Sequence, residues 1–255
     1  RPVRGRRLGG PRKDRPGPQP PLAPCLAAGV LPMAAIGTEF ICHGYSLSAD
    51  EFMADFQVRI FWHGKITAEV PAGWIPAVRV IVPTYVDYLP QTHSWKAAYL
   101  PVYAAMRAVL QSVHLQSLLN PLLAALTILA LYGTARNLWP NEQENALVAI
   151  LLLAVSAQFL CMAMTAYAMP AHLALNMVWL WPYSRPDRRR FYLAPVVGVM
   201  AIGLHQPILH ALLAAPFLCQ PARARHWRRG LILRLSTSLF LCGWFAPRFP
   251  HHRPP

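Results

Sequence analysis

The chain has 255 residues, of which 55% are hydrophobic and only 13% are charged, and its formal net charge is +14. A soluble domain carries about 25% charged residues, so this composition argues against a soluble globular protein. The basic residues gather in short stretches between apolar runs, which is typical of cytoplasmic loops and argues against nucleic acid as a partner. The sequence therefore predicts an all-α integral membrane protein, a polytopic helix bundle with the lipid bilayer as a partner.

Residues 1–20 are rich in Arg, Pro and Gly and are predicted to be a disordered, basic N-terminus. The predicted transmembrane domain covers residues 21–219 and begins with Pro21 to Ile41, a weak span interrupted by Pro24 and Pro32. A basic N-terminus on the cytoplasmic side directs this span outward. A signal peptide is the alternative, although no clear small-residue cleavage site follows.

Residues 43–94 are predicted to form one large extracytoplasmic loop, and six of the ten acidic residues lie in it or beside it, together with aromatics, prolines and glycines. Within this loop, Ser48 and Glu51 have the spacing of a capping box, which predicts the start of a helix. Apolar residues follow at helical spacing and predict an amphipathic helix that lies on the membrane. They are Phe52, Met53, Phe56 and Ile60. Asp55 of this helix is expected to be a solvated charge.

Asp50 lies at the start of the same helix and has two interpretations. Acidic residues stabilise the first turn of a helix, so Asp50 and Glu51 can serve the structure alone. A helix start also aims a carboxylate rigidly, which suits Asp50 to act as a general base or a metal ligand. The five cysteines are scattered and no zinc pattern is present, so the sequence supports no metal and leaves the cofactor undetermined.

Lys96 to Gln111 is apolar but short, and the predicted topology keeps it out of the bilayer. The following span, Ser117 to Arg136, ends at a basic residue and must therefore begin on the outer side, where the loop already lies. Residues 96–111 are thus predicted to form a second interfacial helix. Its basic residues Lys96 and Arg107 either extend to phosphate headgroups or bind a specific lipid phosphate.

The later apolar runs are predicted to cross the membrane alternately outward and inward. They are Asn145 to Met169, Ala171 to Tyr183, Phe191 to His205 and Ile208 to Cys219. Residues 220–255 follow as a basic, Pro-rich tail with one further candidate span at Leu231 to Phe245. The abrupt change of composition before this tail is expected of a frameshifted or truncated gene.

This alternation brings three polar regions to the same outer surface. They are residues 43–94, Thr165 to Leu173, and Gly203 to Pro207. The two turns contribute His172, and His205 with Gln206. A histidine at a helix end is commonly a cap or an interface residue, yet polar groups at membrane depth are functional candidates. The sequence therefore predicts one outer site that these turns share with Asp50.

Five stretches of the sequence occur in an order and at spacings that together are fairly specific. They are "ADEFMADFQVRIFWHGKITAEVP", "KAAYLPVYAAMRAV", "LLNPLLAALTILALYGTARNLWP", "MTAYAMPAHLALNMVWLW" and "GLHQPILHALLAAPFL". Their order resembles that in the polytopic glycosyltransferases of the C superfamily, in particular the dolichyl-phosphate-mannose protein mannosyltransferases and the bacterial lipid A aminoarabinose transferase. The resemblance extends from Ala49 to Leu218, about two thirds of the chain.

This resemblance implies a multi-pass enzyme of the inner membrane that takes a sugar from a polyprenyl-phosphate donor. The acceptor would be a lipid, glycan or protein on the extracytoplasmic side, and the anomeric centre would invert. Asp50 matches the catalytic acid of the family, with Glu51 beside it, and is expected to deprotonate the acceptor hydroxyl. Lys96 matches the basic residue that holds the donor phosphate, and Tyr99 and Arg107 after it are expected to bind substrate.

The sequence departs from the family pattern in two ways. Relatives often carry a second acid in the turn that is here Tyr167 to His172, and His172 is expected to replace it as a donor to phosphate or sugar, with His205 and Gln206 as further substrate-binding residues. The chain is also shorter than these enzymes, which makes an inactive fragment one alternative. The alternative from another class is a non-catalytic membrane protein, either a lipid-phosphate binder or a transporter.

Overall fold

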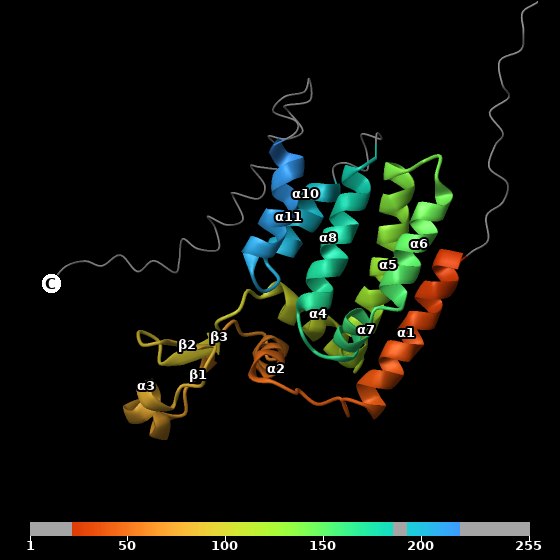
Figure 1. The fold of residues 1–255 in the computed structure, drawn as a ribbon. Coiled ribbons are helices and arrows are strands. Elements are labelled where there is room, and N and C mark those ends of the chain that lie inside the picture. The colour runs from red at the N-terminus through yellow and green to blue at the C-terminus, as the bar shows by residue number, and fades with distance from the viewer. Residues whose placement is uncertain (1–21, 186–192, 220–255) are drawn as a thin grey trace, which may run out of the picture.

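A bundle of upright helices forms the larger part of the protein. The structure is a computed structural model and describes residues 22–185 and 193–219 (Figure 1). The helices of the bundle are α1 (Leu22–Phe40), α5 (Leu119–Leu138), α6 (Gln143–Ala154), α8 (Met169–Tyr183), α10 (Leu193–Ile202) and α11 (Pro207–Cys219). Helix α5 packs against α1, α6 and α8. The prediction of a helix bundle is confirmed.

Two helical segments in the described part of the chain are long and apolar enough to cross a bilayer, judged by length and composition alone. They are α1 and the continuous stretch Gln116–Leu138. Helix α6 and the short helix α7 (Ala157–Met164) make a third if the bent pair is one span. The pair bends by 57°, so the predicted span from Asn145 to Met169 is broken into two helices. The break coincides with Ser156, whose Oγ accepts the N–H of Phe159 and caps α7.

Helix α1 is continuous, although the sequence predicted two interruptions. Pro24 falls in its first turn, where the missing N–H has no intrahelical partner to lose, and Pro32 lies within the helix. The buried face of α1 carries the small residues Ala27 and Ala34, which belong to the same core cluster as Ile128 of α5. Small side chains let neighbouring helices approach closely.

Two glycines lie where helices are closest. A Cβ atom at Gly37 of α1 would overlap the side chain of Met164 on α7. A Cβ atom at Gly133 of α5 would overlap the indole ring of Trp181 on α8. The packing of the bundle therefore depends on the absence of a side chain at these two positions.

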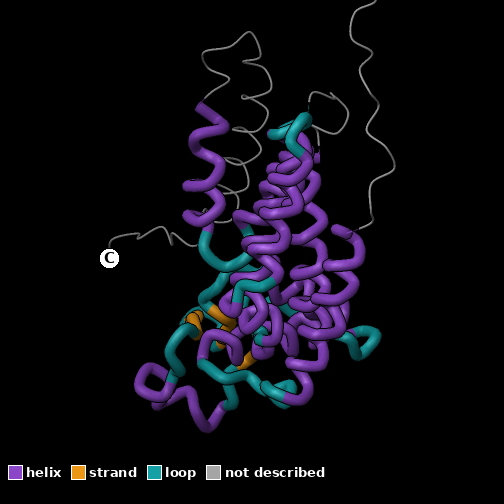
Figure 2. Tube along the Cα trace, turned by 45° about the vertical axis from the view of Figure 1, so that its right-hand side comes forward, coloured by secondary structure: helices purple, strands orange, loops and turns teal. Residues whose placement is uncertain are grey.

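The segment between α1 and α5 folds over one end of the bundle (Figure 2), and we call residues 43–118 the end cap. Its elements are α2 (Ala49–Trp62), β1 (Ala68–Glu69), η1 (Ala72–Ala77), α3 (Val78–Ile81), β2 (Val86–Leu89), β3 (Ser94–Ala97), α4 (Val102–Gln111) and η2 (Gln116–Leu118). The prediction of an ordered loop with a capped helix near Ser48 is confirmed. The face that α2 buries differs in part, since Met53 and Ile60 are buried but Phe52 is half exposed.

A small antiparallel sheet joins the elements of the end cap, and the sequence did not predict it. Its strand order is β1-β3-β2. Gln57 of α2 holds the sheet in place, because its Nε2 donates to the Ile66 carbonyl at 3.1 Å and its Oε1 accepts the N–H of Ala97 at 2.9 Å. The fold is therefore predominantly helical rather than wholly α-helical.

The chain direction alternates along the bundle (Figure 1). Helices α1, α6 and α10 run toward the end cap, whereas α5, α8 and α11 run away from it. The end cap, the connection between α7 and α8, and the connection between α10 and α11 thus lie at one end, as the charge pattern predicted. The predicted N-terminal segment 1–20 and the further span Leu231 to Phe245 lie outside the described residues.

Candidate functional site

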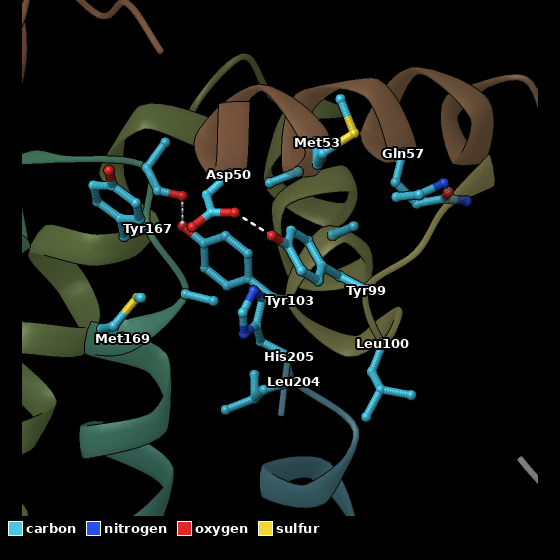
Figure 3. A pocket seen from close by; sticks show the side chains of 15 residues that line it. Asp50, Met53, Gln57, Tyr99, Leu100, Tyr103, Tyr167, Met169, Leu204 and His205 are labelled. Carbon is cyan, nitrogen blue, oxygen red and sulfur yellow. Dashed lines mark hydrogen bonds between the residues drawn. The ribbon is translucent and has the colours of Figure 1, made fainter. Parts of the chain in front are cut away.

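Asp50 is held at the start of α2 by the predicted N-cap. Ser48 is the N-cap residue, and its Oγ accepts the N–H of Glu51 at 3.4 Å. The Glu51 carboxylate reaches back to the N–H of Leu47 at 2.5 Å, one residue earlier than in a capping box. Asp50 is consequently the half-buried second residue of a capped helix. Its side chain points into a cleft that lies between the end cap and residues 166–169 and 204–205 (Figure 3).

Tyr99 covers the Asp50 carboxylate. Its hydroxyl donates a hydrogen bond to Asp50 Oδ1 (Figure 3), and its ring packs against those of Tyr85 and His205. The ring centroids are 5.4 Å apart for Tyr85 and Tyr99, and 3.9 Å apart for Tyr99 and His205. Burial, and then the hydrogen bond to Asp50, raise the pKa of Tyr99, so its hydroxyl remains a proton donor at neutral pH. The structure thus brings Tyr99 and Asp50 together, although the sequence assigned them separate roles.

His205 reaches the same cleft from the connection between α10 and α11. Burial lowers the pKa of His205, and the charge of Asp50 offsets this only in part, so the imidazole is neutral at pH 7. His172 of α8 lies behind it, with the two rings nearly perpendicular and their centroids 6.5 Å apart. The N–H of Gln206 approaches His172 Nε2 at 3.5 Å, whereas the Gln206 side chain is exposed. The predicted convergence of Asp50 with His205 is confirmed, and His172 adjoins them.

The strand-like connection between α7 and α8 is fixed by two polar residues that sequence reasoning missed. Asn120, almost fully buried on α5, donates through Nδ2 to the carbonyls of Thr165 at 2.7 Å and Tyr167 at 2.8 Å. The hydroxyl of Tyr103 on α4 donates to the carbonyl of Ala166 at 2.8 Å. These bonds set the edge of the cleft. Asn120 was detectable, since a strongly polar residue in an apolar run is a candidate for a specific contact.

The cleft at Asp50 is closed in this conformation. Its cavity is about 20 Å³, enough for about one water molecule. Besides Asp50, Tyr99 and His205, its lining includes Tyr167 and Met169 from the connection to α8 (Figure 3). A sugar ring can therefore approach Asp50 only if the aromatic side chains above the carboxylate move aside.

Glu51 differs from Asp50 in its surroundings, although the two are adjacent. Its side chain is fully buried and does not line the cleft, and Oε1 has no hydrogen-bond partner in the described part of the chain. Burial raises the pKa of Glu51, and the backbone groups of Leu47 and Ala166 and the charge of Arg107 offset this only in part. Glu51 thus interacts with the backbone at the start of α2 and with that of Ala166, a residue that lines the cleft, but its own carboxylate does not line the cleft.

The two predicted phosphate ligands lie away from Asp50. Lys96 belongs to β3, opposite Asp87 of β2, and it does not line the cleft. The predicted helix over residues 96–111 is therefore wrong at its start, because α4 begins only at Val102. Arg107 is buried and pairs with Asp55 at 2.5 Å. The predictions that Arg107 extends to headgroups and that Asp55 is solvated are therefore wrong.

Metal ligands do not gather in the described residues, where no group of three or more His, Cys, Asp or Glu side chains could hold an ion. Comparisons of the chain with protein-family models, with curated proteins and with solved structures give no significant match.

Proposed function

We propose that this chain is the catalytic half of a membrane glycosyltransferase that uses a polyprenyl-phosphate-linked sugar. One observation carries the proposal: a half-buried carboxylate, Asp50, stands at a rigid helix start in a cleft that Tyr99 and His205 complete from two other segments. A carboxylate in a concave site, with hydrogen-bonding groups from separate elements around it, is suited to general base chemistry.

The surface of the bundle supports insertion into a membrane. Large apolar side chains are exposed on several of its helices, which are Leu122 and Leu129 of α5, Val148 and Leu152 of α6, Val196 of α10 and Leu212 of α11. An exposed apolar surface of this extent calls for a lipid environment. Arg136 is in the last turn of α5 and Arg185 lies just beyond α8, and both helices end on the side away from the end cap, which favours that side as the cytoplasmic one. These features support a multi-pass protein of the inner (plasma) membrane with its cleft outside.

In the proposed reaction, Asp50 takes the proton of an acceptor hydroxyl. The acceptor oxygen attacks the anomeric carbon from the side opposite the phosphate, and the bond between that carbon and the phosphate oxygen breaks. Polyprenyl phosphate leaves with the electron pair, and the configuration at the anomeric carbon inverts. A general base in such a step contributes about 10²–10⁴-fold to the rate.

The residues around Asp50 suit a sugar phosphate. The exposed ring of Tyr85, which stacks on Tyr99, presents an apolar face on which a sugar ring can lie. Neutral His205 carries one N–H that can donate to a sugar or phosphate oxygen. Arg107 is engaged by Asp55 and stands outside this cleft, so in this proposal Tyr99 and His205, rather than Arg107, contact the donor.

A non-catalytic membrane protein remains the second candidate, and one observation favours it. The hydroxyl of Tyr99 already satisfies Asp50 Oδ1, and the cleft admits about one water molecule, which is the arrangement of a structural contact. Under this alternative, Asp50 matters only for the stability of α2. The two candidates therefore predict different losses when only the charge of Asp50 is removed. The first predicts a loss of transfer activity, and the second predicts an effect on the stability of α2 alone.

The Asp50→Asn variant separates the two candidates. Asparagine keeps the size of the side chain and an oxygen that can accept from Tyr99, but it cannot act as a base. The full chain in proteoliposomes would be given polyprenyl-phosphate hexose or pentose together with a mixture of lipid, glycan and peptide acceptors, and release of polyprenyl phosphate would be measured. We expect release to fall at least about 100-fold, with the melting temperature nearly unchanged.

The matched control is Glu69→Gln, which also removes a carboxylate charge from the end cap. Glu69 is exposed and pairs with Lys65, which is also exposed, so release should stay at the wild-type level. Wild-type release by Asp50→Asn would reject Asp50 as the base. No release by the wild-type chain, with bound donor detected or not, would favour the non-catalytic candidate.

A further inference from the structure

A second cavity lies between α2 and α4, away from the cleft at Asp50. Its volume is about 300 Å³, and it is lined by the later part of α2, by α4 and by the segment that leads into α5. None of its lining residues belongs to the Asp50 cleft. Asp50 and Arg59, a lining residue of this second cavity, are nine positions apart on α2, which corresponds to about 14 Å along the helix. The two cavities therefore have separate linings, and the second one contains none of the groups around Asp50.

The second cavity carries more positive than negative charge. Arg59 and Arg107 both line it, and the single carboxylate among the lining residues is that of Asp55. Asp55 pairs with Arg107 at 2.5 Å, whereas the exposed guanidinium of Arg59 has no carboxylate partner among residues 22–185 and 193–219. An anion that enters the cavity would thus find a cation that no protein group neutralises.

Two buried polar atoms of the lining lack hydrogen-bond partners in the described part of the chain. One is Nε of Arg107, whose side chain is only 8% exposed. The other is Oε1 of Gln116. A buried polar atom without a partner costs about 1–3 kcal/mol, and both atoms belong to residues that line the same cavity. Both atoms lie beneath the wall of the cavity, so a ligand would satisfy the N–H and the amide oxygen once the side chains of Arg107 and Gln116 turn toward it.

We propose that this cavity binds the phosphate ester of a polyol, as found in a glycerophospholipid headgroup or in a soluble polyol phosphate. The phosphate oxygens would accept from Arg59 and from Nε of Arg107, a pairing that guanidinium groups favour. A hydroxyl of the polyol would donate to Oε1 of Gln116. Trp62, half exposed at the cavity, supplies an apolar wall for the carbon chain. This site does not depend on the proposed transfer activity.

Titration calorimetry of the full chain in detergent, with glycerol 3-phosphate as the probe, tests the site. We expect binding by the wild type and a Kd about tenfold weaker in Arg59→Gln, because one charge-assisted hydrogen bond is lost. The control is Arg79→Gln, since Arg79 is exposed on α3 and outside the cavity, and its Kd should change by less than about twofold. Absence of wild-type binding, or equal Kd values for wild type and Arg59→Gln, would overturn the proposal.

Gln116→Leu gives a second measurement that does not depend on charge. It should weaken binding of glycerol 3-phosphate while leaving binding of inorganic phosphate unchanged, because only the polyol hydroxyl uses Oε1. Equal losses for both probes would refute the assigned role of Gln116. The Asp50→Asn variant should bind glycerol 3-phosphate as tightly as the wild type, so this site can stand even where the transfer activity fails.

Nanodiscs identify the natural source of the ligand. The chain would be embedded in phosphatidylglycerol or in phosphatidylcholine and titrated again with glycerol 3-phosphate. Loss of soluble binding in phosphatidylglycerol alone would identify a lipid headgroup as the occupant. Equal binding in both lipids would identify a soluble ester, and either result supports the cavity as a phosphate ester site.

Discussion

The bundle and the end cap are held together in different ways. Helices of the bundle touch through small residues such as Gly37 and Gly133, and their stability depends on steric fit. The end cap uses paired polar groups instead, including Asp55 with Arg107 and the Gln57 amide on the sheet. The difference teaches that close steric contacts set how the bundle helices pack at these positions. In the end cap, by contrast, polar side chains hold one another in orientation. Substitutions in each region can test this contrast.

The largest effect is expected in the end cap, from Asp55→Ala. This change leaves the Arg107 guanidinium buried without its partner, and removal of one member of a buried pair costs about 3–5 kcal/mol; the partial exposure of Asp55 favours the lower end of that range. Chemical denaturation of the chain in detergent would measure the loss. The exposed pair of Lys65 and Glu69 gives the control, because Lys65→Met should shift stability by less than about 0.5 kcal/mol. Similar losses in both variants would contradict the importance of burial.

A smaller loss is expected in the bundle, from Gly133→Ala. The new methyl group would overlap the indole of Trp181, and insertion of a methyl group into a packed interior costs about 1–3 kcal/mol. Gly29→Ala on α1 is the matched control, since no atom lies within 4 Å of the Cβ position there. That change should instead stabilise the helix by about 0.5–1 kcal/mol. Losses of equal size at both glycines would contradict steric fit as the cause.

The smallest effect concerns Glu51 and the dependence of stability on pH. Burial raises the pKa of Glu51 above 4.5, so the folded protein binds this proton more tightly than the unfolded chain. The stabilisation from this group is therefore present at low pH and is lost as the pH rises through 4.5 toward the folded pKa. Glu51→Gln keeps an acceptor for Leu47 and cannot ionise. Its melting temperature relative to the wild type should rise between about pH 4.5 and about pH 7.5, and a constant difference would exclude this titration.

Local patterns predicted the parts of the structure that depend on neighbours in sequence. The Ser48 cap and the alternating direction of the bundle helices follow from nearby residues and from the placement of charge. The partner of Arg107 lies 52 positions away, and no local pattern connects the two residues. Strands of two to four residues carry too little periodicity to be recognised. For this reason the sequence predicts the start of a helix where β3 lies.

The candidate site was predicted in outline but not in detail. Charge alternation brought Asp50 and His205 to one end, and the structure agrees with this. The cover over Asp50 was missed, since stacking of Tyr85 on Tyr99 depends on a turn in which Tyr85 has a positive φ of 67°. The bend before α7 was missed because the apolar run contains no Pro or Gly there, and a single serine interrupts it.

The hydrogen bond from the Tyr99 hydroxyl to Asp50 has a consequence for the choice between an acceptor and water. In the proposed enzyme, the base rests in a masked state, and an incoming hydroxyl must displace Tyr99 before it can lose its proton. A lone water molecule fits the closed cavity but gains few contacts that would move two aromatic rings. An acceptor that spreads over Tyr85 and His205 gains those contacts. Tyr99 would thereby reduce the hydrolysis of the lipid-linked sugar donor by water.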